Sequence, residues 1–139
     1  MRQATTTLCV ETKGIGLYEF THEVAGWVQS SGITEGLLTL FIRHTSASLA
    51  VQENADPDVR KDLADAFDRM APMTRGLYRH SAEGPDDMPA HIKAALSDVS
   101  LSIPVLNRQP VFGTWQGVYV FEHRTSAQER HVVCHLAGA

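Results

Sequence analysis

Residues 36–53 read GLLTLFIRHTSASLAVQE, two apolar segments separated by a polar turn. The first segment, Gly36 to Arg43, is apolar at odd and even positions alike, which is typical of a strand with both faces covered. We therefore predict a central strand that is covered on both sides or lies at a subunit contact. The second segment, Leu49 to Glu53, is predicted to be a strand joined to the first through the polar turn at residues 44–47.

The residues before this pair predict a strand, a turn and a short helix. Met1 to Glu11 is rich in threonine and alternates weakly, which favours a strand. Residues 13–16 contain two glycines and predict a turn, after which residues 17–20 would continue a hairpin. Thr21 is a suitable N-cap for a helix that ends at Gly32, because its hydroxyl can accept a bond from a free backbone N–H.

The middle of the chain predicts two helices separated by a long loop. Asp56 as N-cap and Pro57 at the first helical position begin the clearest helix of the sequence. Its apolar stripe consists of Val59, Leu63, Ala66, Phe67 and Met70. Residues 73–86 have no helical period, and a loop of this length is usually functional or disordered. A third helix is expected from about Pro89 to Ser97.

The last forty residues alternate between apolar and polar positions, which predicts antiparallel strands. Pro104 places its strand at a sheet edge. In the next strand, one face would carry Trp115, Gly117, Tyr119, Phe121 and His123, and the other Thr114, Gln116, Val118, Val120 and Glu122. Arg130 to Leu136 is the closing strand. The predicted fold class is α+β, a single domain over residues 1–139 with about three helices on mostly antiparallel sheet.

Length and charge exclude several classes of protein. The 139 residues suffice for one domain and fall short of the roughly 250 of a (β/α)₈ barrel. Acidic residues outnumber basic ones 16 to 12, and no basic run exceeds two residues, so nucleic acid is not an expected partner. No apolar run approaches the roughly 20 residues of a membrane span. Because Cys9 and Cys134 fit no zinc spacing, we interpret both as reduced, buried thiols and expect a cytoplasmic protein without membrane contact.

The sequence contains seven histidines, an unusually large number for its length. His22 is predicted to be plain surface. His131 and His135 share a strand face about 13 Å apart, too far to bind one metal, and are interpreted as structural. The other four lie at predicted strand ends or beside the acidic segment at residues 83–87: His44, His80, His91 and His123. An imidazole there can bind a metal or transfer a proton. The alternative is a solvated acidic loop with incidental histidines.

The segment Gly113-Thr114-Trp115-Gln116-Gly117 places two glycines inside a predicted strand. Such glycines mark the close approach of a ligand or another backbone, or else a bulge in a curved sheet. Gln116 would lie opposite Trp115, where its amide could bind a substrate. No nucleophile elbow, phosphate loop or dinucleotide fingerprint is present.

Five separated segments resemble the YjbQ family. In order along the chain they are HTSASL (44–49), ENADPDV (53–59), YRH (78–80), EGPDDMPAHIK (83–93) and GTWQGVY (113–119). The resemblance runs from about residue 5 to residue 138. It implies a small α/β subunit, commonly assembled as a homotrimer, with a metal or anion pocket near the subunit boundary.

The resemblance also suggests roles for individual residues. It implies a divalent metal, zinc or magnesium, held by His44, His80 and His91. The candidate catalytic residues are Glu53, Gln116 and His123. The candidates for binding a substrate or its anionic groups are Arg124, Arg130, Trp115 and Thr114.

Two functions follow, and the residues do not separate them. Members of the family are often described as secondary thiamine-phosphate synthases, which join a pyrimidine diphosphate to a thiazole phosphate and expel pyrophosphate. That reaction needs a cation and arginines to neutralise the diphosphate. The alternative is a non-enzymatic trimer that binds a metal or a phosphorylated metabolite and has only incidental activity. A kcat/KM of about 10⁴ M⁻¹s⁻¹ or above would favour the enzyme.

Overall fold

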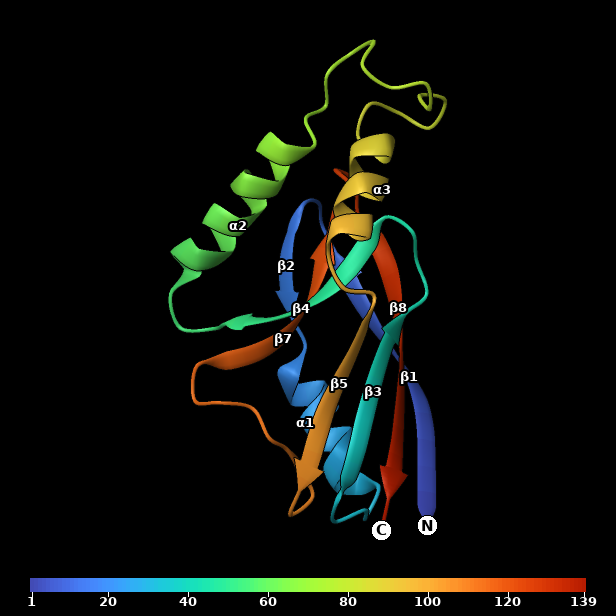
Figure 1. Cartoon of the computed structure of the whole chain (residues 1–139), viewed down its shortest axis with the longest axis vertical. Helices are drawn as coiled ribbons and strands as arrows, with labels where there is room; N and C mark the ends of the chain where they lie inside the picture. Colours follow the sequence, from blue (N-terminus) through green and yellow to red (C-terminus); the bar gives the residue numbers. More distant parts are fainter.

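Three helices and eight strands make up the structure, a computed structural model that describes residues 1–139 (Figure 1). In chain order they are β1 (Arg2–Thr12), β2 (Gly16–Glu19), α1 (Thr21–Ser30), β3 (Gly36–Ile42), β4 (Ala47–Glu53), α2 (Pro57–Met70), α3 (Asp87–Leu96), β5 (Ser100–Leu106), β6 (Gln109–Pro110), β7 (Gln116–Glu122) and β8 (Gln128–Gly138). The predicted α+β class and the three helices are confirmed.

The strands form two antiparallel sheets, one in the order β1-β8-β3-β5-β6 and one in the order β2-β7-β4. β3 is central, as predicted. The predicted hairpin of β1 with β2 is wrong, because β1 pairs with β8 along its whole length and β2 pairs with β7. Gly14, with φ of 131°, lies in the turn that takes the chain from one sheet to the other. β4 likewise pairs with β7 and not with β3.

The core lies between the two sheets and α1. Val118 and Val120 of β7 belong to the same buried cluster as Leu38 and Leu40 of β3. Helix α1 adds further buried side chains, among them Val24. Thr21 does not cap this helix as predicted. Phe20 holds the N-cap position, while the Thr21 hydroxyl accepts a bond from the backbone N–H of Val118.

The outer face of the five-stranded sheet is open to solvent. Leu37 and Phe41 of β3 are 49% and 46% exposed, whereas the alternate residues of that strand are buried. The chain therefore covers β3 on one side only. Cys9 of β1 is exposed and Cys134 of β8 is buried, so the prediction that both thiols are buried is wrong for Cys9. Both cysteines are free.

Helices α2 and α3 lie on the other side of the three-stranded sheet. Asp56 caps α2 by accepting a bond from the backbone N–H of Asp58, and Pro57 is its first residue, as predicted. The Phe67 ring of α2 packs on Phe121 of β7 with 4.9 Å between centroids. The predicted loop is confirmed, since residues 71–86 contain neither helix nor strand. None of the three helices combines the length and the apolar character needed to cross a membrane.

Candidate functional site

Two histidines and one aspartate meet where the loop at residues 71–86 joins α3. Asp87 is the first residue of α3, His91 lies one turn further along it, and His80 comes from the loop. Oδ2 of Asp87 lies 2.7 Å from Nε2 of His80 and 3.0 Å from Nε2 of His91. The three donor atoms lie within 4.8 Å of one another, so this group can hold one metal ion.

The second ring nitrogen of His91 fixes the orientation of its imidazole. Nδ1 lies 2.8 Å from the carbonyl oxygen of Thr45, and Nδ1 carries the proton because a carbonyl oxygen can only accept. Nε2 of neutral His91 therefore directs its lone pair at the Asp87 carboxylate. Two acceptors in such contact require a proton or a cation between them. A ring held by a backbone carbonyl in this way is typical of histidines that bind metals.

Asp86, Asp87 and Arg124 form an ion-pair cluster beside His80 and His91. Arg124 donates from Nε to Asp86 at 2.9 Å, and its Nη1 lies 2.9 Å from Oδ1 of Asp87. Burial alone would raise the pKa of Asp86, but bonds from Arg124 and Thr125 outweigh it and lower this pKa to about 2. For Asp87, burial is likewise outweighed by the two histidines and Arg124, which lower its pKa. Both carboxylates are ionised at neutral pH, so this ion-pair cluster of two carboxylates and one guanidinium keeps one net negative charge.

A cavity of about 570 Å³ adjoins His80. Residues of the loop at 71–86 line it, among them Arg75, Ser81 and Gly84. The guanidinium and the hydroxyl are hydrogen-bond donors, which are the groups that bind an anionic ligand. The volume is within the range of small-molecule sites.

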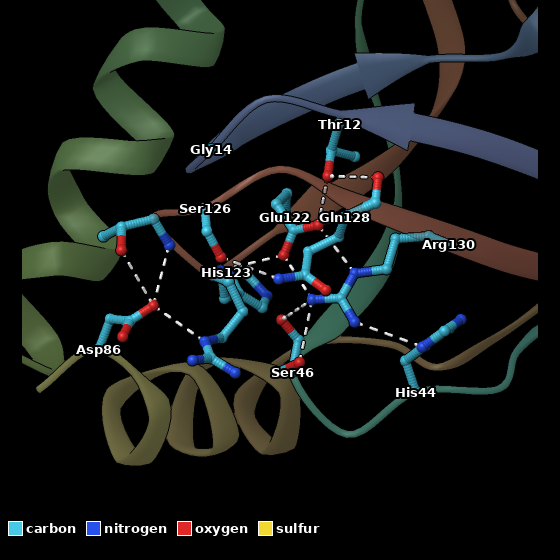
Figure 2. A network of polar contacts seen from close by, with 12 residues as sticks. Thr12, Gly14, His44, Ser46, Asp86, Glu122, His123, Ser126, Gln128 and Arg130 are labelled. Atoms are coloured by element: carbon cyan, nitrogen blue, oxygen red, sulfur yellow. Dashed lines mark hydrogen bonds and ion pairs between the residues drawn. The ribbon is translucent and has the colours of Figure 1, made fainter. Parts of the chain in front are cut away.

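The predicted metal ligand His44 belongs to a different group of side chains (Figure 2). Its Nε2 accepts a bond from the backbone N–H of His131 at 2.8 Å, and its Nδ1 lies 3.3 Å from Nη1 of Arg130. Burial and the positive charge of Arg130 lower the pKa of His44. His44 is therefore not part of the group formed by His80, Asp87 and His91, and both of its ring nitrogens face N–H donors.

The two arginines expected to bind anions are both paired with carboxylates. Arg130 donates from Nε to Glu122 at 2.7 Å and from Nη2 to the hydroxyl of Ser46 at 2.9 Å, with a side chain only 5% exposed (Figure 2). Arg124 is neutralised by Asp86 and Asp87. A guanidinium already paired with a carboxylate has less charge available for a ligand, so these pairings do not support the expected anion-binding roles.

The candidate catalytic residue His123 is fully buried. Its Nε2 lies 2.8 Å from the hydroxyl of Ser48, its ring packs against both Phe67 and Phe121, and its Nδ1 has no partner. Burial and the charges of Lys93 and Arg130 lower its pKa to about 3. At neutral pH the ring is uncharged and enclosed, which suits packing better than proton transfer.

The remaining candidates lie at the other end of the three-stranded sheet. In the ladder of β4 with β7, Glu53 pairs with Gln116 at one end, and Ala47 pairs with Glu122 at the end near His123. The six residues from Ala47 to Glu53 span about 20 Å along the strand. Glu53 accepts bonds from the two backbone N–H groups before α2, and Gln116 accepts one from Gly113. The other two candidates, Thr114 and Trp115, lie in the segment just before β7. Both are exposed to solvent, Trp115 to 64%. The structure therefore separates these four residues from His80 and His91 in one chain.

The packing of this chain explains why position 117 is a glycine. A Cβ there would collide with the carboxylate of Glu19 and approach the hydroxyl of Thr21. The close approach predicted from this glycine is thus made by the chain's own side chains.

Sequence reasoning did not assign a role to Asp87, although it lies at the centre of the site. The available signal was its spacing from His91. Residues four apart on a helix face the same way, so the pair Asp87 and His91 predicts one shared face at the start of α3.

The family model, the curated relatives and a solved structure agree on one family. The family model described as UPF0047 protein YjbQ-like matches residues 6–139. A UPF0047 protein of Synechocystis is 49% identical over 99% of this chain and 93% of its own length, and Escherichia coli O157:H7 YjbQ is 40% identical over 95% and 96%. A crystal structure of a YjbQ/UPF0047 family protein from Clostridium acetobutylicum has a TM-score of 0.87 at 33% identity, covering 95% of this chain and 99% of that one.

Proposed function

The chain belongs to the UPF0047 YjbQ-like family, and we propose that it binds a divalent metal through His80, Asp87 and His91 and uses it to hold a phosphorylated small molecule. One observation supports this most directly. Oδ2 of Asp87 lies within 3.0 Å of two imidazole nitrogens, one of which is held by a backbone carbonyl.

Zinc suits this donor set better than magnesium. Two imidazole nitrogens and one carboxylate oxygen are ordinary zinc ligands, whereas magnesium prefers oxygen alone. Three protein ligands would leave the fourth zinc position for water or for an oxygen of the ligand. A bound zinc ion would supply positive charge for an anionic group at that position.

The charges around the site support an anionic ligand. The ion-pair cluster of Asp86, Asp87 and Arg124 has one net negative charge, and a bound divalent cation would make the net charge of the site positive. Arg75 and Ser81 line the adjoining cavity and can donate to phosphate oxygens. We therefore assign the phosphate-binding role to this loop in place of Arg124 and Arg130.

Thiamine-phosphate synthesis is the enzymatic form of this proposal. It rests on the resemblance to the family and on a site that would combine a cation with an arginine beside a small-molecule cavity. The non-enzymatic form, a metal- and phosphometabolite-binding protein with incidental activity, uses the same residues. A steady-state assay separates the two at a kcat/KM of about 10⁴ M⁻¹s⁻¹.

A homotrimer in the cytoplasm completes the proposal. The exposed Leu37 and Phe41 of β3 support self-association, because a subunit contact over β3 and β5 would remove them from water. Such a contact leaves β1, at the opposite edge of the sheet, outside it. In such an assembly, the end of one subunit that carries Trp115 and Gln116 could approach the histidines of another. The two free thiols suit a reducing compartment.

The experiment is zinc binding by Asp87→Asn, with Asp62→Asn as the matched control. Asp62 is an exposed residue of α2 with no side-chain contact to the site. All proteins in this comparison carry Cys9→Ser, which removes the exposed thiol as a second zinc ligand. In this background we expect equilibrium dialysis to show at least about a 10-fold loss of zinc affinity in Asp87→Asn and none in Asp62→Asn. Inorganic pyrophosphate should bind the wild-type protein more tightly with zinc than without it. Equal zinc affinity with and without Asp87→Asn in the Cys9→Ser background would overturn the metal site.

A further inference from the structure

A second group of metal-binding side chains lies on the open face of the five-stranded sheet. Cys9 comes from β1, and Glu129 and His131 come from β8. One donor atom from each side chain lies within 4.8 Å of the other two. All three residues are exposed, so an ion from solution can reach them.

The sheet itself brings these three residues together. Cys9 and His131 are direct partners in the antiparallel ladder of β1 with β8, so their side chains leave the same face. Glu129 lies two residues before His131 and therefore shares that face. The ladder runs unbroken from Arg2 to Thr12, which makes this a rigid support for a binding site.

Two neighbouring contacts favour a cation at this place. Glu11 lies directly opposite Glu129 in the same ladder, and like charges in that position repel each other. A bound cation would offset that repulsion. On another side, the ring of His44 stacks on His131 with 5.7 Å between centroids and 17° between planes, which restrains the imidazole.

We propose that Cys9, Glu129 and His131 form a surface site for a thiophilic divalent cation such as zinc. A thiolate, an imidazole and a carboxylate are three of the common zinc ligands, and the thiolate disfavours magnesium and calcium. Binding replaces the thiol proton of Cys9 by the metal. The fourth position remains open to water or to a donor from another molecule.

The donor atoms separate this site from the one at Asp87. The site of His80, Asp87 and His91 contains no sulfur, whereas the surface site contains the thiolate of Cys9. Cobalt(II) is a spectroscopic substitute for zinc, and a thiolate bound to it gives a ligand-to-metal charge-transfer band in the near ultraviolet. This band therefore reports the surface site alone.

The test is a cobalt titration of the wild-type protein and of single variants. We expect the charge-transfer band in wild type and in Asp87→Asn, and its loss in Cys9→Ser. His131→Ala should weaken the cobalt affinity read from this band by at least about 10-fold. The matched control is His135→Ala, because His135 lies on the same strand face but bonds to Gln3; it should titrate as wild type does.

Thiol labelling gives a second measurement that needs no variant. Cys9 is exposed and Cys134 is buried, so a thiol reagent added to the folded protein reports Cys9. We expect zinc to slow this labelling. The proposal is overturned if wild type shows no charge-transfer band, if the band survives in Cys9→Ser, if His131→Ala binds cobalt as tightly as wild type, or if zinc leaves the labelling rate unchanged.

Discussion

Arg130 and Glu122 join the two sheets of the molecule through a buried, two-point ion pair. Nε of Arg130 lies 2.7 Å from Oε1 of Glu122, and Nη2 lies 2.5 Å from Oε2. Arg130 belongs to β8 of the five-stranded sheet and Glu122 to β7 of the three-stranded sheet. Both side chains are at most 5% exposed, so each charge depends on the other for its compensation.

The first prediction is that Glu122→Gln strongly destabilises the fold. The substitution would leave the guanidinium of Arg130 buried without its counter-charge, which costs about 3–5 kcal/mol. Urea denaturation at pH 7 measures this loss. Replacing both residues, as in Glu122→Leu with Arg130→Met, should recover a large part of it. Glu35→Gln, at an exposed glutamate, is the control; a Glu122→Gln protein as stable as this control would contradict the prediction.

The second prediction concerns the start of α2. Asp56→Ala removes the bond from the carboxylate to the backbone N–H of Asp58 and should reduce the free energy of unfolding by about 1 kcal/mol. Chemical denaturation of this variant and of Asp62→Ala, within the same helix, gives the comparison. The zinc affinity of Asp56→Ala should equal that of wild type. A variant of unchanged stability that loses zinc would show that Asp56 belongs to the site.

Local signals predicted the helices better than the pairing of the strands. Asp56 and Pro57 act within one turn of backbone, so the start of α2 could be read from them. The partner of β2 could not be read in this way. Leu17 pairs with Phe121, more than a hundred residues away, and no feature near Leu17 distinguishes this register from a hairpin.

The candidate site was predictable in part for the same reason. His80 and His91 flank a glycine-containing acidic segment, which is a local signal, and they do meet in space. The roles expected of Arg124 and Arg130 depended on whether their charges were free. Their partners lie elsewhere in the fold, Asp86 beside α3 and Glu122 on β7, so only the structure reveals that these guanidinium groups are already paired.

The third prediction is a pH dependence of stability caused by His123. Burial, together with Lys93 and Arg130, lowers its pKa to about 3 in the folded protein, against about 6.5 in the unfolded chain. Between these values the unfolded chain binds the proton and the folded protein does not. Stability contributed by His123 is therefore lost as pH falls below about 6.5, by about 1.4 kcal/mol per pH unit well inside this window.

Urea denaturation between pH 7 and pH 5 tests this assignment, because most carboxylates titrate at lower pH. His123→Gln should show a shallower fall in stability than wild type. His44, whose pKa is also lowered, will keep part of the slope in that variant. His22→Gln, at an exposed position of α1, should keep the wild-type slope. Identical slopes for His123→Gln and wild type would refute the assignment.

The last prediction separates the two histidines that sequence reasoning placed in one metal site. His91→Ala should weaken zinc binding at the site of Asp87 by at least about 10-fold, because it removes a ligand that the carbonyl of Thr45 holds in place. His44→Ala should leave this affinity unchanged, because the nitrogens of His44 face Arg130 and the backbone N–H of His131. Both variants are compared by equilibrium dialysis in a Cys9→Ser background, so that the surface site does not contribute. If His44→Ala loses zinc as severely as His91→Ala, the three histidines converge after all, and the assembled protein must then bring them together from different chains.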